Sequence, residues 1–343
     1  MNYLLGLLLV FAAGLGTGTV AWPMKLIRRL EFEHYWLVGM FIGLICLPWL
    51  VVLTQVPDPW RALAQAGWRP LLISNLCAAG WGAANVLYGV CVVRIGAALT
   101  GALLSGAGAM VAITMPMVFK GSGRFGAAPD LLSATGMGIL CGLVVMLLGV
   151  AVTAIAGFGR DKLRGQSDAG AGHGFLSGLI MTLVAGVLSA GLSLAFVYGQ
   201  GPLMKAFLAQ GVSESVANIG VWAAAIFGGA LVNVLYPVLV ISRKKTWRAF
   251  ASAGRDLFLG AMIGIQFIIA VFLLGRGMLL LGALGASIGV GVQMVTQLFG
   301  NQLVGFVSGE WRGIRGRPMA FMCGGILLLS VAAAILAMCK YIG

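Results

Sequence analysis

Long stretches of the sequence run almost without charge for the length of a membrane-crossing helix. Residues 1–20 hold no charged side chain, and in residues 126–158 only Asp130 is charged. A helix crosses the roughly 30 Å hydrocarbon core of a bilayer with about 20 mostly apolar residues. Only 9% of the 343 residues are charged, against about 25% in an average globular domain. The sequence therefore predicts an all-α integral membrane protein that crosses the bilayer many times.

Ten apolar segments are predicted to form transmembrane helices. They are residues 3–22, 35–55, 70–91, 95–119, 131–157, 174–199, 215–241, 257–274, 279–307 and 319–342. Of the 22 Lys and Arg residues, 15 follow odd-numbered segments. An excess of Lys and Arg in short loops marks the cytoplasmic side, so both chain termini are expected outside. The net charge of +13 is explained by these loop Lys and Arg residues, which would face the anionic cytoplasmic leaflet. We therefore expect the lipid bilayer as a partner, and no nucleic acid.

The longest polar stretch divides the ten segments into two sets of five. It covers residues 159–173, which we expect to be a cytoplasmic linker between a first repeat, residues 1–158, and a second, residues 174–343. Because five is odd, the second set would enter the bilayer in the opposite direction, and the repeats would be inverted. Transporters built from inverted repeats bind their substrate near the membrane midplane, between the halves.

Two internal similarities favour inverted repeats. A glycine pair eight residues apart in the first segment recurs in the sixth (Gly6 and Gly14, Gly178 and Gly186). Very short turns are predicted at Arg94, between the third and fourth segments, and at Arg276, between the eighth and ninth. Both features occupy corresponding positions in the two halves.

No Asp, Glu, Lys, Arg or His is predicted near the middle of a segment. Proton pumps, ion exchangers and voltage sensors usually keep an ionisable group at that depth. His34 and His173 are expected in loops, so a metal site within the membrane is not expected. No nucleophile can be paired with a base that would activate it. The sequence therefore predicts neither an enzyme nor a bound cofactor.

Several uncharged polar residues are predicted at depth, and some repeat with helical spacing. They are Trp81, Asn85 and Tyr88 in the third segment, Ser189 and Ser193 in the sixth, Asn233 in the seventh, Gln266 in the eighth, and Gln293, Gln297 and Asn301 in the ninth. A buried amide without a partner is costly, so each must bind another helix, water or a substrate. Interhelical bonding is the simpler alternative for any single residue. Together they predict a site for a neutral, hydroxyl-rich solute, with Trp81 or Tyr88 stacking on a sugar ring. The predicted substrate-binding residues are these ten without Asn233 and Asn301.

Motifs along the whole chain resemble the L-rhamnose–proton symporter family, a ten-helix branch of the drug/metabolite transporter superfamily. In order, the matching residues are Glu33-x-x-Trp36-x-Val38-Gly39, Leu47-Pro48-Trp49, Trp81-Gly82-x-x-Asn85-x-x-Tyr88-Gly89, Ser189-Ala190-Gly191-x-Ser193, Gly228-Gly229-Ala230-x-x-Asn233, Gln266-Phe267, and Gly305 with Glu310-Trp311 through Arg317-Pro318. The motif around Asn85 and the one that begins at Glu310 are the most specific.

The resemblance implies two inverted five-helix halves in a bacterial-type inner membrane, importing a deoxy-sugar such as L-rhamnose with a proton. Because no segment carries a titratable group at depth, the proton would reside on a carboxylate at a segment end. Glu33 and Glu310 are the candidates, although either could be a helix-end pairing residue instead. The alternative functions are a carrier or exporter of another neutral metabolite, and a membrane subunit without transport activity.

Overall fold

The described chain is helical throughout. The computed structural model describes residues 2–165 and 175–341, and no strand occurs among them. The first part contains α1 (Asn2–Thr19), α2 (Ala21–Leu26), α3 (Phe32–Met40), the π-helical η1 (Phe41–Cys46), α4 (Leu47–Gln55), α5 (Pro59–Ala66), α6 (Trp68–Ile95), α7 (Ala97–Val118), η2 (Gly123–Ala127) and α8 (Ala134–Leu163). The second contains α9 (Phe175–Ser189), α10 (Gly191–Leu208), α11 (Glu214–Ala225), α12 (Phe227–Lys244), η3 (Trp247–Ser252), α13 (Gly254–Leu281), η4 (Gly282–Leu284), the π-helical η5 (Gly285–Gly289), α14 (Val290–Val307), α15 (Arg317–Met338) and η6 (Cys339–Tyr341). The all-α prediction is confirmed for these residues.

The described residues contain eight helical segments long and apolar enough to cross a membrane, or nine when the bent pair α11–α12 counts as one span. The eight are Asn2–Leu26, Phe32–Gln55, Trp68–Val92, Leu99–Val118, Ala134–Leu163, Leu176–Leu208, Gly254–Val307 and Arg317–Tyr341. The chain is therefore a multi-pass membrane protein. Gly254–Val307, 54 residues long, joins what the sequence predicted as the eighth and ninth segments.

The two short turns lie at glycines. Gly96 separates α6 from α7 with φ +82°. α13 continues through Arg276, and the chain turns at Gly282, where φ is +62°. The predicted turn at Arg276 is therefore wrong. This arginine stays within the helix because its guanidinium pairs with Glu214 at 2.5 Å, whereas left-handed φ values favour glycine.

A side chain from α6 bridges the break between α11 and α12, which meet at 52° around Ile226. The Oδ1 atom of Asn75 accepts a hydrogen bond from the main-chain N–H of Gly228 at 2.6 Å, and its Nδ2 donates to the carbonyl of Ala224 at 2.9 Å. In an unbroken helix those two main-chain groups would bond to each other. The amide therefore replaces the lost bond and keeps both groups satisfied inside the membrane.

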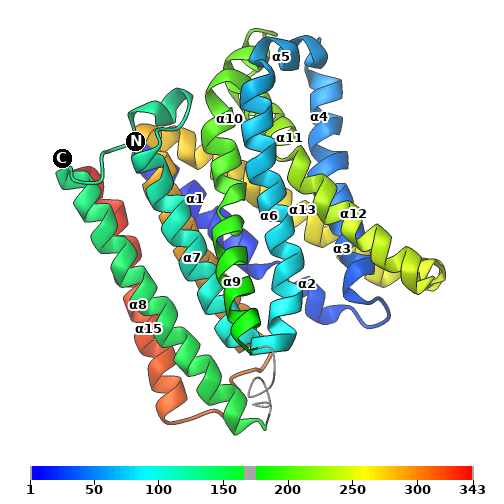
Figure 1. The fold of residues 1–343 in the computed structure, drawn as a ribbon, viewed down its shortest axis with the longest axis vertical. Helices are drawn as coiled ribbons and strands as arrows, with labels where there is room; N and C mark the ends of the chain where they lie inside the picture. The colour runs from blue at the N-terminus through cyan, green and yellow to red at the C-terminus, as the bar shows by residue number, and fades with distance from the viewer. Residues whose placement is uncertain (1, 166–174, 342–343) are drawn as a thin grey trace.

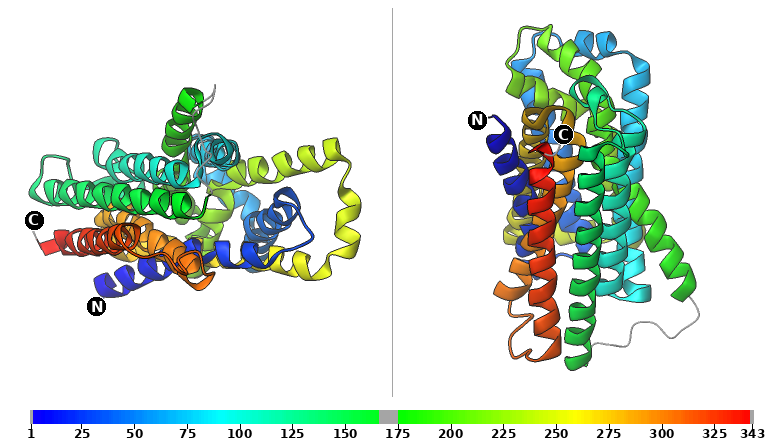
Figure 2. Two further views of the ribbon diagram at one scale, coloured as in Figure 1. Left: turned by 90° about the horizontal axis from the view of Figure 1, so that it is seen from below. Right: turned by 90° about the vertical axis from the view of Figure 1, so that its left-hand side faces the viewer.

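Helices far apart in the sequence lie side by side. α8 runs along α15 at one edge of the bundle, and α1 packs on α13 and α14 (Figures 1 and 2). α6 contacts α9, α10 and α12. Both ends of the chain lie toward the same end of the bundle (Figure 1). The helices thus enclose a core to which both parts of the chain contribute.

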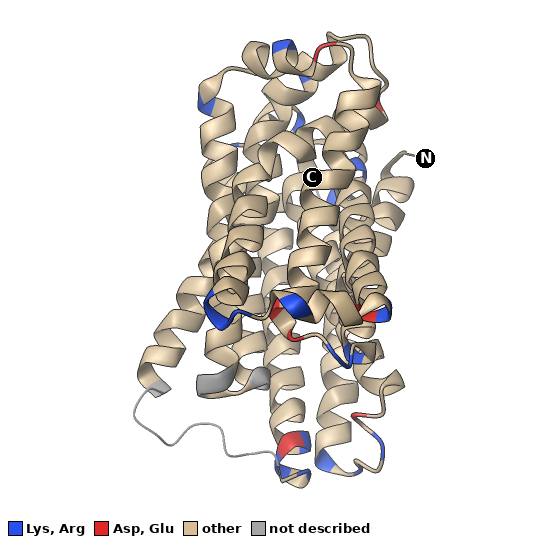
Figure 3. Cartoon of the chain, turned by 90° about the vertical axis from the view of Figure 1, so that its right-hand side faces the viewer, with Lys and Arg blue, Asp and Glu red and all other residues tan. Residues whose placement is uncertain are grey.

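Charged residues lie near helix ends and in connecting segments (Figure 3). The end formed by segments 20–31, 158–165, 242–256 and 308–317 is called here the Lys/Arg-rich end. Ion pairs join these segments and the first turn of α3, namely Lys25–Glu310, Arg160–Glu310, Lys244–Glu31 and Lys244–Glu33. The opposite end has its own pairs, Lys120–Asp130, Arg124–Glu214 and Arg276–Glu214. Within the described residues, no ion pair joins one end to the other.

Two further predictions need correction. α8 continues to Leu163, so the first part of the predicted linker 159–173 is helical, while residues 166–173, with His173, lie outside the described residues. His34 lies in the first turn of α3 and not in a loop. Its side chain is buried, and its Nε2 lies 3.0 Å from the Thr246 hydroxyl. The prediction was wrong because the apolar run begins only at Tyr35, whereas the helix begins three residues earlier, with a first turn that contains polar residues.

Candidate functional site

A cavity of about 270 Å³ lies inside the bundle, between helices from both parts of the chain. Six of the eight predicted substrate-binding residues line it: Trp81, Asn85, Ser189, Ser193, Gln293 and Gln297. Within the described chain, no Asp, Glu, Lys, Arg or His side chain lines it. Sites for drug-sized ligands usually measure about 300–1,000 Å³, so this central cavity suits a smaller, uncharged solute.

A stacked aromatic pair forms one wall of the central cavity. The ring centroids of Trp81 on α6 and Phe267 on α13 are 5.7 Å apart, and the ring planes differ by 9°. Gly229 on α12 leaves room for the indole, because a side chain there would collide with it. Phe267 covers one face of Trp81, so a sugar could contact only the remaining indole surface or the far face of Phe267.

Two glutamines of α14 present complementary groups to the cavity. Thr17 on α1 donates its hydroxyl proton to its own helix, at Ala13 and Gly14, and so accepts from Gln293 Nε2 at 3.2 Å. The same nitrogen donates to Gln297 Oε1 at 3.0 Å. These two bonds use both hydrogens of Gln293 Nε2. Gln293 is left with Oε1 as an acceptor, and Gln297 is left with Nε2 as a donor.

The two serines of the cavity wall also act as acceptors. Ser189 donates its hydroxyl proton to the carbonyl of Gly186 at 2.6 Å, and Ser193 donates to that of Ala190 at 3.1 Å. Each hydroxyl oxygen keeps lone pairs for another donor. The cavity therefore offers more acceptors than donors, which favours a ligand with several hydroxyl groups.

A second cavity, of about 390 Å³, adjoins the first toward the Lys/Arg-rich end. Trp36 and Asn85 line both cavities, and Asn233 and Glu33 line the second. Asn233 Oδ1 accepts from Asn85 Nδ2 at 3.0 Å and from Trp36 Nε1 at 3.2 Å. These three side chains, from α3, α6 and α12, form the wall between the cavities. The carboxylate of Glu33 therefore lies in the second cavity, next to the uncharged central cavity.

Two predicted site residues do not line the central cavity. Gln266 donates to the Gly16 carbonyl and the Thr19 hydroxyl, both at 2.8 Å, so it ties α13 to α1. Tyr88 is 40% exposed on α6. It shares a helix face with Trp81 but lies seven residues, or about 10 Å, further along the axis. Helical spacing predicts a common face and not a common depth, which explains why Tyr88 was misplaced.

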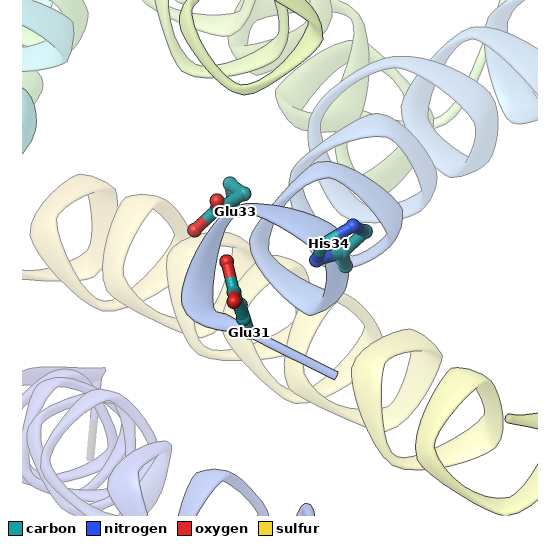
Figure 4. A group of neighbouring side chains, drawn as sticks. All are labelled: Glu31, Glu33 and His34. Atoms are coloured by element: carbon teal, nitrogen blue, oxygen red, sulfur yellow. The ribbon is translucent and has the colours of Figure 1, made fainter. Parts of the chain in front are cut away.

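Glu33 belongs to a small ionic cluster at the start of α3. The carboxylates of Glu31 and Glu33 approach one another beside His34 (Figure 4), and ligand atoms of the three residues lie within 4.8 Å of each other. The ammonium of Lys244 on α12 binds both carboxylates, at 2.9 Å to Glu31 and 2.6 Å to Glu33. Because Lys244 already supplies the positive charge, the cluster is best described as an ion-pair network between α3 and α12.

Glu310 sits in the turn after α14, between two cations. Lys25 binds one of its carboxylate oxygens, and Arg160 binds the other at 2.6 Å. Partial burial raises the pKa of the Glu310 carboxyl, but the ion pair with Lys25 and the charge of Arg160 outweigh it and hold the pKa below its usual value. The side chain lines neither cavity. This environment is that of a structural ion pair, because it ties the turn after α14 to α2 and α8.

Sequence reasoning missed several lining residues. Thr17, Trp36, Ser105 and Phe267 line the central cavity but were not predicted as site residues. Trp36 and Phe267 belong to the motifs that resemble the symporter family, so those motifs could have identified them. Thr17 gave no such signal, because a threonine in an apolar helix usually bonds to its own backbone, and its second contact, with Gln293, comes from another helix.

The sequence matches the family described as L-rhamnose-proton symport protein over residues 2–340. It is similar to the L-rhamnose-proton symporters of Yersinia pestis (strain Pestoides F) and Yersinia pseudotuberculosis (serotype O:1b, strain IP 31758). Each is 25% identical over 323 residues, covering 91% of this chain and 91% of the relative.

A multi-pass helical bundle around an uncharged, solute-sized cavity defines a membrane transporter, and not an enzyme. The family match covers nearly the whole chain. The chain belongs to the L-rhamnose–proton symport family.

Proposed function

We propose that this chain imports L-rhamnose together with a proton. The observation that carries the proposal is the central cavity, where amides and hydroxyls converge without a charged side chain. A charged substrate would need a counter-charge at this depth, whereas sugar hydroxyls can donate to the oxygens of Asn85, Gln293, Ser189 and Ser193. The family description and the names of the Yersinia relatives supply the identity of the sugar and the coupling ion.

The segment Gly254–Val307 supports ten membrane crossings. At 1.5 Å per residue its 54 residues would span about 80 Å as one helix, more than twice the hydrocarbon core. The turn at Gly282 divides it into two spans. With α11–α12 as one bent span, the count becomes ten. An even number agrees with chain termini that lie toward the same end (Figure 1).

The packing pattern supports inverted repeats, residues 1–158 and 174–343. In the first repeat α1 packs on α13 and α14 of the second, and in the second α9 packs on α6 and α7 of the first. Likewise α3 contacts α13, as α12 contacts α6, while α8 pairs with α15. When each helix is replaced by its counterpart in the other repeat, the same set of helix contacts results. Gly14 lies against Gln293 and Thr296, and its counterpart Gly186 lies against Leu103 and Ala107.

The Lys/Arg-rich end is proposed to face the cytoplasm, with both termini in the periplasm. The second cavity extends toward Glu33 at this end. At the opposite end Phe125, Phe196 and Trp222 are fully buried, and the Phe196 and Trp222 rings stack 4.4 Å apart. This arrangement supports our proposal of a form open toward the cytoplasm. A single cysteine placed at exposed Trp247 should resist an impermeant thiol reagent in intact cells, and one at Lys205 should react; the reverse would overturn the orientation.

Glu33 is our choice for the proton carrier. It lines the cavity next to the central one, and Trp36 and Asn85 connect the two. A proton on Glu33 would weaken its bond to Lys244, and so loosen the contact between α3 and α12. Glu310, the other candidate, is held by two cations away from both cavities.

Binding distinguishes this function from the alternative, a carrier of another neutral metabolite. L-rhamnose should raise the melting temperature of the purified protein, because a ligand that binds only the folded state stabilises it. D-glucose, which has the opposite configuration at several carbons and an extra hydroxyl, should have a much smaller effect. Absence of any response to L-rhamnose would favour another solute.

A further inference from the structure

We propose that Asn233 is a positioning residue that sets the polarity of the sugar site by fixing the amide of Asn85. Asn233 lines the second cavity and not the central one, so it acts on the sugar through its neighbour. This inference rests on the proposed function. It concerns which atom of Asn85 the substrate meets.

The orientation of the Asn233 amide follows from the main chain. Its Nδ2 lies 2.9 Å from the carbonyl oxygen of Gly229, one turn earlier on α12. A carbonyl can only accept a hydrogen bond, so the amide must place its NH₂ group on this side. Its Oδ1 then faces the opposite way, toward α3 and α6.

Trp36 gives the same orientation independently. The indole Nε1–H can only donate, and it lies 3.2 Å from Asn233 Oδ1. A flipped Asn233 would set donor against donor at Trp36 and acceptor against acceptor at Gly229. Asn233 is almost completely buried, so each mismatch would be costly. The oxygen of Asn233 is therefore fixed in the wall between the cavities.

This fixed oxygen determines what Asn85 presents to the central cavity. Asn233 Oδ1 requires a donor from α6, and Asn85 Nδ2 supplies it at 3.0 Å. Asn85 is then left with Oδ1 as its free acceptor, and it lines the central cavity. A sugar hydroxyl that donates is preferred there to a carbonyl or ether oxygen that accepts. Without Asn233 the Asn85 amide could rotate and present either group.

The test is a double-mutant cycle on L-rhamnose affinity, measured per folded molecule with Asn233→Leu, Asn85→Ala and the combination. We expect Asn233→Leu to weaken binding about 10-fold and Asn85→Ala about 10- to 100-fold. In the Asn85→Ala background, Asn233→Leu should add no more than about twofold, because its effect passes through an amide that is no longer present.

A matched control separates positioning from packing. Asn218→Leu removes another buried amide, which ties α11 to the Phe272 carbonyl of α13 and lines neither cavity. It should lower the melting temperature and leave affinity unchanged. If Asn233→Leu does not fold, Asn233→Ala removes the same oxygen and takes its place in the cycle, with the same loss of about 10-fold expected.

Three results would overturn the inference. Multiplicative losses in the double variant would show that Asn233 acts independently of Asn85. Unaltered affinity in Asn233→Leu would show that Asn85 needs no positioning, and an equal loss in Asn218→Leu would reduce the effect to packing. Failure of the unaltered protein to bind L-rhamnose would instead refute the proposed function, on which this inference rests.

Discussion

The indole of Trp81 lies parallel to the ring of Phe267, with the ring centroids 5.7 Å apart. Replacing Trp81 with leucine removes this stack and part of the cavity wall. We expect L-rhamnose affinity to fall roughly 10-fold, about 1.4 kcal/mol, and the melting temperature to fall as well. Trp81→Phe keeps an aromatic ring against Phe267, so its loss of affinity and of melting temperature should be smaller. The control is Trp60→Leu, because Trp60 also stacks on an aromatic ring, that of Trp49, but is 65% exposed and lines neither cavity.

Gln297 and Gln266 form a matched pair of buried amides with different predicted roles. Gln297→Leu removes the free donor of the central cavity and should weaken L-rhamnose binding by about 1–3 kcal/mol. Gln266→Leu breaks only the tie between α13 and α1, so stability should fall while affinity stays within about twofold. Isothermal titration and thermal unfolding measure the two effects separately. Equal affinity losses in both variants would contradict the assignment of the cavity.

Asn75 is predicted to be a structural residue. Asn75→Leu leaves the Gly228 N–H and the Ala224 carbonyl without their partner, at a cost of about 1–3 kcal/mol for each buried group. The melting temperature should therefore drop by several degrees. Its neighbour Ser74 bonds only within its own helix, at Pro70 and Leu71, so Ser74→Ala should change stability much less. An unaltered melting temperature in Asn75→Leu would mean that α11 and α12 can rejoin as one helix.

The ion pairs of Glu310 predict a pH dependence of stability. Because the folded-state pKa of Glu310 lies below its usual value, its ionised form stabilises the fold above the unfolded pKa of about 4.3. This contribution is lost as pH falls through the folded pKa. The melting temperature of Glu310→Gln should thus lie below that of the unaltered protein at pH 7. The difference should begin to narrow as pH falls below about 4.3 and should vanish below the folded pKa. A constant difference across this range would exclude Glu310 ionisation as its source.

The sequence was sufficient to predict the membrane-spanning class, because uncharged runs of this length have few other solutions. Six site residues that meet in one cavity could be predicted from a simple rule, that polar amides and hydroxyls at depth require partners. Depth and rotation could not be predicted in this way. Tyr88 shares a helix face with Trp81 but lies beyond the cavity. The amide of Gln266 donates its hydrogen bonds to α1.

Charge patterns were less reliable guides to helix ends. Arg276 suggested a loop, yet Glu214, 62 residues earlier in the chain, satisfies it within α13. The bend at Ile226 had no local signal, since the group that stabilises it, the amide of Asn75, comes from another helix. Interactions of this kind depend on tertiary packing, which periodicity within one segment does not encode.

Uptake into proteoliposomes tests the central claim, proton-coupled import of L-rhamnose, most directly. With an acidic exterior, the unaltered protein should accumulate L-rhamnose above its external concentration, and collapse of the pH gradient should abolish accumulation. Glu33→Gln should still equilibrate the sugar but no longer concentrate it, while Glu310→Gln should concentrate it normally once folded. If the unaltered protein only equilibrates L-rhamnose whatever the gradient, the chain is a facilitator and the claim of symport is wrong.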